Sequence, residues 1–127
     1  MLLNDFFKIK RIKKDKSNTG SATVRVEINR LHAVFDGHFP GNPIVPGVCQ
    51  LQMIKEILSE LEGKTYYLKK GIDIKHIGII VPGEPPLLDF NLDYSAESDD
   101  SVSMNCTITA EDKTFLKFRG VFVEKLA

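Results

Sequence analysis

Residues 35–63 read FDGHFPGNPIVPGVCQLQMIKEILSELEG, and the second half of this stretch predicts one long helix. Its apolar residues recur every three or four positions, as on one face of a helix. They are Val48, Leu51, Met53, Ile54, Ile57, Leu58 and Leu61. Pro46 suits the first helical position and Gly63 the end of the helix. Because the apolar residues cover more than half of the circumference, we expect this helix to be mostly buried.

Strand-like segments flank this helix on both sides. Alternating apolar residues and turn signals predict a hairpin before it, formed by residues 5–14 and 21–29. Four more strands are expected after it, at residues 66–77, 88–94, 104–108 and 114–124. This order predicts an α+β fold in which an antiparallel sheet wraps around one central helix. The length of 127 residues fits a single domain, residues 1–127.

The net charge of the chain is zero, because 17 basic and 17 acidic side chains cancel. No global field therefore draws the protein toward nucleic acid or a membrane surface. The start of the chain, MLLNDFFKIKRIKKDK, lacks the apolar core and cleavage site of a signal peptide. No apolar run approaches the ~20 residues that span a bilayer. We expect a cytoplasmic protein that binds neither nucleic acid nor membrane.

The histidines and cysteines do not form a metal-binding pattern. His32, His38 and His76 are scattered, and neither Cys49 nor Cys106 stands at a metal-ligand spacing. Cys49 falls in the predicted helix and Cys106 in a predicted strand. We therefore expect two reduced, buried thiols, without a disulfide or a metal site.

The loop before the helix carries the first candidate for chemistry. After a turn signal at Asp36-Gly37, His38 stands nine positions ahead of Gly47, and prolines stiffen the residues between them. Gly47 and the following Val48 bring backbone N–H groups to the positive end of the predicted helix. A base beside an anion-binding helix terminus suits removal of a proton next to a carbonyl. The alternatives are a structural histidine and a Pro-Gly step that merely begins a helix.

Two motifs in the chain match a known family. Residues 35–48, FDGHFPGNPIVPGV, are similar to the signature G-H-F-P-G-x-P-[IV]-x-P-G-V, and GID at 71–73 with VPGE at 81–84 is similar to a second one. The chain thus resembles the hot-dog-fold β-hydroxyacyl–acyl carrier protein dehydratases. The resemblance covers residues 22–95 well and the last two strands by pattern only, and the N-terminus is less typical. It implies the hot-dog fold.

The resemblance implies a role for each matching position. His38 would be the catalytic base, and the Gly47 N–H, with Val48 beside it, would hold the thioester oxygen. Position 52 matches the family's acidic residue, which assists the departing hydroxyl, but here it is Gln52. In the family the histidine and the acid come from different subunits of a dimer, and the acyl chain lies in an apolar tunnel between them. No metal or organic cofactor is used. We accordingly expect a homodimer or a trimer of dimers, or a heterodimer with a homologue.

Gln52 decides how active such a site can be. An amide cannot supply a proton near neutral pH. Losing one positioned general acid typically costs about 10²–10⁴-fold in rate, out of a total acceleration of at least ~10⁶-fold. Gln52 can instead orient a water molecule or the substrate hydroxyl. Glu56, one helical turn further on, is a candidate auxiliary acid acting through water. The alternative for Glu56 is a solvated helix charge paired with lysines.

A basic run near the start of the chain is the strongest local charge feature. It consists of Lys8, Lys10, Arg11, Lys13, Lys14 and Lys16. Because carrier proteins are acidic, the run is a candidate docking patch. The alternative is that alternating lysines protect an edge strand from unwanted pairing.

Three functions fit these features. The first is an enzyme that removes water from a 3-hydroxyacyl thioester, bound to acyl carrier protein or CoA, in fatty-acid or related acyl-chain synthesis. The second is a non-catalytic or half-active subunit that binds acyl carrier protein or pairs with a catalytic homologue. The third is an acyl thioesterase, which other hot-dog proteins are. Gln52 motivates the second reading, whereas the sequence offers no acidic residue at a confident position for the third.

Overall fold

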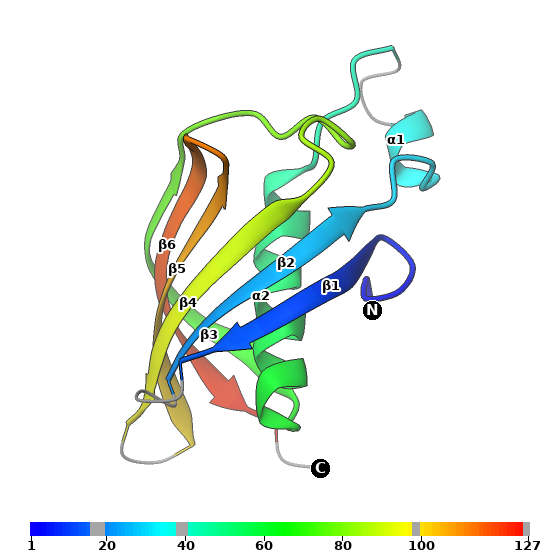
Figure 1. The fold of residues 1–127 in the computed structure, drawn as a ribbon. Coiled ribbons are helices and arrows are strands. Elements are labelled where there is room, and N and C mark those ends of the chain that lie inside the picture. Colours follow the sequence, from blue (N-terminus) through cyan, green and yellow to red (C-terminus); the bar gives the residue numbers. More distant parts are fainter. Residues whose placement is uncertain (16–19, 38–40, 98–99, 126–127) are drawn as a thin grey trace.

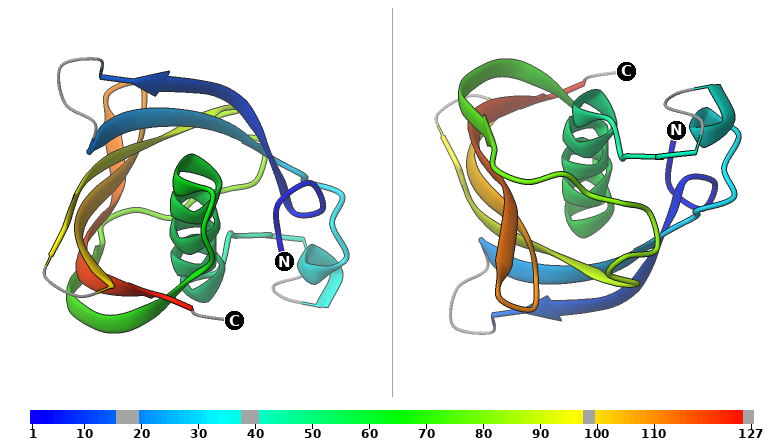
Figure 2. Two further views of the ribbon diagram at one scale, coloured as in Figure 1. Left: turned by 90° about the horizontal axis from the view of Figure 1, so that it is seen from below. Right: turned by 90° about the horizontal axis from the view of Figure 1, so that it is seen from above.

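The computed structural model describes residues 1–15, 20–37, 41–97 and 100–125. Its elements are β1 (Phe7–Lys14), β2 (Ser21–Ile28), α1 (Val34–Gly37), α2 (Gly47–Glu62), β3 (Tyr66–His76), β4 (Leu88–Ala96), β5 (Ser101–Ala110) and β6 (Lys113–Glu124). The strands form one antiparallel six-stranded sheet in the order β1-β2-β4-β5-β6-β3. The sheet curves around α2 (Figure 1), and views from both ends show the helix inside the curve (Figure 2). The predicted α+β arrangement is confirmed.

The core lies between the concave side of the sheet and α2. Every second residue of β5 is buried, namely Val102, Met104, Cys106, Ile108 and Ala110. They share one apolar cluster with the buried helix residues Met53, Ile54, Ile57, Leu58 and Leu61. Each large side chain of this kind contributes about 1.5–3 kcal/mol when it leaves water. The period of two on the strands and the apolar stripe on the helix therefore meet in one core.

Helix α2 begins and ends where local backbone chemistry permits. Pro46 has extended backbone angles and forms the N-cap, so the helix starts at Gly47, one residue later than predicted. Gly63 ends it in the left-handed region with φ 67°, and its N–H donates to the Ser59 carbonyl oxygen at 2.9 Å. Glycine adopts that conformation without a Cβ clash. Within the described ranges, no helix is long and apolar enough to cross a membrane.

The predicted turn at Asp36-Gly37 is wrong, because these residues belong to the short helix α1. His32 initiates this helix. Its Nδ1 accepts the Val34 N–H at 3.0 Å, and its carbonyl oxygen accepts the Phe35 N–H at 3.1 Å. Since Phe35 is buried, packing adds to this local capping and outweighs the turn preference of Asp-Gly.

The first predicted strand begins two residues too early. Asp5 and Phe6 lie in a turn, in which both N–H groups donate to the Leu2 carbonyl oxygen, at 3.1 and 2.7 Å. We call residues 2–6 the N-terminal turn. It inserts the fully buried Phe6 ring into the core, which anchors the turn beside α2.

Strand β3 approaches its neighbour β6 at a pair of glycines. Gly71 faces Gly120 across the two strands. A Cβ on Gly120 would lie 2.6 Å from Phe118 Cζ and 2.7 Å from the Lys70 carbonyl oxygen. A side chain there would require the backbone to move, so glycine at position 120 permits the close approach of β3 to β6.

Candidate active site

The loop that enters α2 is tied to the segment after β3. His38, the predicted base, lies outside the described residues, which stop at Gly37 and resume at Gly41. Further along, Val45 is buried, and its N–H donates to the Ile80 carbonyl oxygen at 2.8 Å. This bond fixes the last residues before the helix N-terminus.

The first N–H groups of α2 are free to bind a ligand. The N–H groups of Cys49 and Gln50 donate to the Pro46 carbonyl oxygen at 3.1 and 3.2 Å. Those of Gly47 and Val48 have no acceptor among the described residues, as is usual for a first helical turn. The Val48 side chain is 76% exposed. The predicted oxyanion position therefore has two free donors at the positive end of the helix dipole.

His76, at the end of β3, lies against this helix terminus. A Cβ on Gly47 would be 3.0 Å from both Cε1 and Nε2 of the His76 ring. In the sequence, His76 is one of three scattered histidines. Its proximity arises because β3 runs back along α2, and no local motif signals that contact. Glycine at position 47 leaves space for an imidazole beside the free N–H groups.

Gln52 and Glu56 form a direct pair on α2. Gln52 Nε2 donates to Glu56 Oε2 at 2.6 Å, across one helical turn. Glu56 is only 6% exposed, whereas Gln52 is half-buried. Glu56, the candidate auxiliary acid, is thus a buried residue in direct contact with Gln52, which stands at the family's acid position.

Backbone N–H groups of the N-terminal turn bind the Glu56 carboxylate. The Leu2 N–H is 2.9 Å from both Oε1 and Oε2, and the Leu3 N–H donates to Oε1 at 2.8 Å. The ion pairs found between described residues do not include Glu56. The alternative of a solvated charge paired with lysines is therefore wrong. No local pattern signals these bonds, which join residues more than fifty positions apart.

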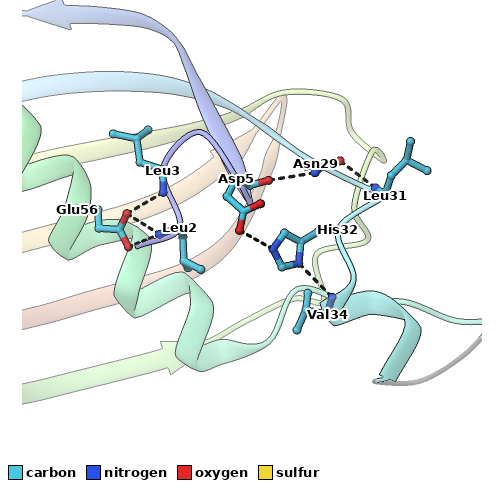
Figure 3. A network of polar contacts seen from close by, with 8 residues as sticks. All are labelled: Leu2, Leu3, Asp5, Asn29, Leu31, His32, Val34 and Glu56. Atoms are coloured by element: carbon cyan, nitrogen blue, oxygen red, sulfur yellow. Dashed lines mark hydrogen bonds and ion pairs between the residues drawn. The ribbon is translucent and has the colours of Figure 1, made fainter.

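The same N-terminal turn contacts the segment that leads into α1, as Figure 3 shows. Asp5 Oδ2 lies 3.0 Å from His32 Nε2, while His32 Nδ1 accepts the Val34 N–H. Since Nδ1 accepts, the proton of a neutral ring resides on Nε2 and points at Asp5. Asn29 Nδ2 also donates to the Asp5 carbonyl oxygen at 3.0 Å. The turn thus connects α2 near Gln52 with the residues just ahead of His38.

Gln52 and Glu56 line a surface groove of about 490 Å³ along the exposed side of α2. Met1, Leu3, Ser59 and Tyr66 line other parts of it. The half-buried Gln52 is therefore accessible from outside the sheet and the apolar core, whereas Glu56 beside it is nearly buried.

Five of the six basic residues of the predicted docking patch lie on edge strand β1, and the sixth, Lys16, lies outside the described residues. Lys8, Lys10, Arg11, Lys13 and Lys14 are all exposed. The pairing of β1 with β2 also shifts register between Ile9 and Arg11. A bulge and a row of cations both hinder the pairing of further strands. The position of these residues on an edge strand therefore fits the interpretation that they protect the edge.

Both cysteines are free thiols. Cys106 is completely buried, and burial raises the pKa of its thiol. Cys49 is only partly buried, which corrects the prediction of two buried thiols, and desolvation raises its pKa also. Neither thiol is therefore activated as a nucleophile.

The fold and the helix terminus together define a hot-dog protein. Solved structures with the same fold include the dehydratase heterocomplex ApeI:P from Xenorhabdus doucetiae, with a TM-score of 0.68 and 17% identity over 91% of this chain and 98% of that one. A mutant of the thioesterase SAV0944 from Staphylococcus aureus has a TM-score of 0.61 and 10% identity, covering 94% of this chain and 93% of that one. The predicted hot-dog fold is confirmed.

Sequence comparison identifies the family. The ApeI-like family, described as ApeI dehydratase, matches residues 13–119. The chain is 32% identical over 121 residues to the 3-hydroxyacyl-[acyl-carrier-protein] dehydratase FabZ of Lactobacillus helveticus, covering 87% of this chain and 79% of that protein. The corresponding FabZ of Lactiplantibacillus plantarum is 31% identical over 109 residues, or 78% and 71% of the two chains. This chain belongs to the ApeI-like dehydratase family, and the dehydratase class predicted from the sequence is confirmed.

Proposed function

We propose that this protein removes water from a 3-hydroxyacyl thioester on acyl carrier protein or CoA and produces the trans-2-enoyl thioester. The observation that carries the proposal is the pair of free N–H groups at Gly47 and Val48, nine residues beyond His38 in the family's signature. These donors would hold a thioester oxygen at the positive end of the helix, and the signature assigns removal of the adjacent C2 proton to His38. The setting that we propose is acyl-chain synthesis in the cytoplasm.

The reaction needs a base, an oxyanion site and a proton for the leaving group. His38 removes the C2 proton, and negative charge develops on the thioester oxygen. One well-placed donor there stabilises the transition state by about 3–4 kcal/mol. The bond between C3 and the hydroxyl oxygen then breaks.

The leaving hydroxide must also receive a proton. Gln52 has no ionisable proton, and its Nε2 donates to Glu56. The proton held by the His38 imidazolium can neutralise the hydroxide, which gives water and returns His38 to its neutral form. In this scheme Gln52 positions the hydroxyl and His38 serves as both base and acid.

We propose that the working unit contains two chains joined at β3. This edge strand has unpaired backbone groups, and several large apolar side chains on and after it are exposed, namely Ile72, Ile74, Ile77 and Ile79. A second copy pairing there would cover them. A homodimer, or a trimer of such dimers, is our first choice.

The alternative of a half-active subunit has a specific observation in its favour. Position 52 lacks the carboxyl group, and the ApeI:P neighbour is a heterocomplex. In that case the apolar β3 edge would bind a homologue that supplies the acid. A thioesterase activity is a weaker alternative, which rests on fold similarity to structures such as SAV0944.

One assay separates these functions. Purified protein is mixed with a 3-hydroxyacyl carrier protein or its N-acetylcysteamine mimic, and both enoyl product and free thiol are recorded. Enoyl product that disappears in His38→Ala, with fold and assembly mass unchanged, supports the dehydratase. Release of free thiol indicates a thioesterase. A silent wild type that becomes active on Gln52→Glu indicates the half-active subunit.

A further inference from the structure

The orientation of the Gln52 amide follows from its contact with Glu56. Both Glu56 oxygens accept hydrogen bonds, from Leu2, Leu3 and Gln52, which is the pattern of an ionised carboxylate. An ionised carboxylate can only accept, so the Gln52 atom 2.6 Å away must be the nitrogen. The Gln52 carbonyl oxygen Oε1 consequently points elsewhere, and it has no donor among the described residues.

The Glu56 side chain cannot easily abandon this arrangement. It is nearly buried, and two backbone N–H groups of the N-terminal turn bind its oxygens. Hydrogen bonds to an ionised group are roughly twice as strong as neutral ones. Rotating the carboxylate away would leave a buried charge without partners, which is strongly unfavourable. Gln52 therefore has a fixed neighbour that admits one amide orientation.

We propose that Glu56 is a positioning residue that presents Gln52 Oε1 as a hydrogen-bond acceptor for the 3-hydroxyl group of the acyl ligand. The proposal rests on the proposed function, because it assigns Gln52 to the hydroxyl end of the substrate. An amide free to rotate would offer a donor or an acceptor with similar ease. With Glu56 in place, the site prefers a ligand whose C3 oxygen donates a hydrogen bond, as a hydroxyl does, over one whose C3 oxygen can only accept. Discrimination of this kind is largest where a site polar group is left unpaired by the wrong ligand.

The test measures binding, so that it does not depend on turnover. Two unreactive ligands are compared by calorimetry, a 3-hydroxyacyl pantetheine amide and its 3-oxo counterpart of the same chain length, whose oxygen at C3 can accept but not donate a hydrogen bond. We expect the wild type to bind the hydroxyl ligand about 10-fold more tightly, the value of one net hydrogen bond. Glu56→Gln, whose amide can accept as well as donate, should reduce this preference to less than about 3-fold. An unchanged preference in Glu56→Gln, or none in the wild type, overturns the proposal.

A double variant separates positioning from general structural damage. Gln52→Glu combined with Glu56→Gln places a carboxylate at position 52, which accepts in any orientation, and keeps the total charge. We expect it to regain the preference for the hydroxyl ligand, although residue 56 is still glutamine. If the preference stays lost while Glu56→Gln and the double variant are folded, Glu56 acts by holding the structure and the proposal fails. A wild type that prefers the hydroxyl ligand but forms no enoyl product refutes the catalytic function and leaves this inference standing.

Discussion

The two edge strands of the sheet, β1 and β3, are both open to pairing with a further strand, but their exposed side chains differ. Each has a row of backbone groups that no neighbouring strand of the sheet satisfies. Both strands shift register against their neighbours, once in β1 and twice in β3, so the difference lies in the exposed side chains. On β1 five exposed cations discourage pairing. On β3 three exposed lysines accompany the exposed Ile72 and Ile74, and further exposed isoleucines continue beyond the strand at Ile77 and Ile79.

This difference distinguishes a protected edge from one that is suited to a partner. Edge cations keep their hydration only if no strand covers them, whereas exposed isoleucines gain when they are covered. The β3 edge also ends at His76, which touches the helix terminus at Gly47. A partner at β3 would therefore lie close to the candidate active site.

The largest effect is expected from placing charge on the β3 edge. If the proposed β3 dimer is correct, Ile72→Lys with Ile74→Lys should convert it to monomers and lower enoyl formation at least about 100-fold, because catalytic groups are misplaced without the partner. Light scattering and the enoyl assay measure the two results. Ile12→Lys on β1, where the isoleucine is 44% exposed, is the matched control and should change neither. A dimer that survives the β3 substitutions contradicts the proposed interface.

The next effect tests how β3 is held at its edge. Gly120→Ala should lower the free energy of unfolding by about 1–3 kcal/mol, because its Cβ would meet the Lys70 carbonyl oxygen and the Phe118 ring. Denaturant titration measures the change. Gly37→Ala is the control, since a Cβ at that position meets no atom of the described residues within 4 Å. Equal stability of the two variants would mean that the strands separate more easily than the structure indicates.

Charge reversal on β1 distinguishes a docking patch for acyl carrier protein from cations that only protect the edge strand. Lys8→Glu, Lys10→Glu and Arg11→Glu together should raise KM for an acyl carrier protein substrate about 10-fold at low salt, because an acidic partner is repelled. KM for the N-acetylcysteamine mimic should not change. Lys113→Glu with Lys117→Glu, on β6, provides a control for added negative charge. Unchanged KM values with increased aggregation would favour edge protection alone.

The smallest effect concerns Tyr94 on β4, away from both edges. Burial, followed by the hydrogen bond that its hydroxyl donates to Glu62 at 2.7 Å, raises the pKa of Tyr94 above the ordinary tyrosine value of 10. Folding thus favours the protonated phenol, and this contribution is present below pH 10 and is lost as the pH rises above it. Compared with Tyr94→Phe, the wild type should lose stability between pH 9 and 11. Parallel stability curves of the two proteins across that range would disprove the coupling.

Much of the architecture could be predicted from local patterns. The apolar stripe of α2 and the alternation in β4 and β5 specify elements whose periods are readable over ten residues. The signature before α2 located Gly47 and Gln52. The errors at α1 and the N-terminal turn arose where His32 and Phe6 bring in tertiary contacts. The burial of Glu56 could not be predicted, because its partners are the backbone N–H groups of Leu2 and Leu3, more than fifty positions earlier in the chain.

By itself, the sequence determined the central helix, the six strands and the dehydratase motif, because periodicity and motif spacing are properties of neighbouring residues. Tertiary structure alone decided which strands become edges, that His76 reaches Gly47, and that the N-terminal turn binds Glu56 and so orients Gln52. Each of these is a contact between residues far apart in the chain. Such contacts depend on how the whole sheet closes around the helix, which no local pattern contains.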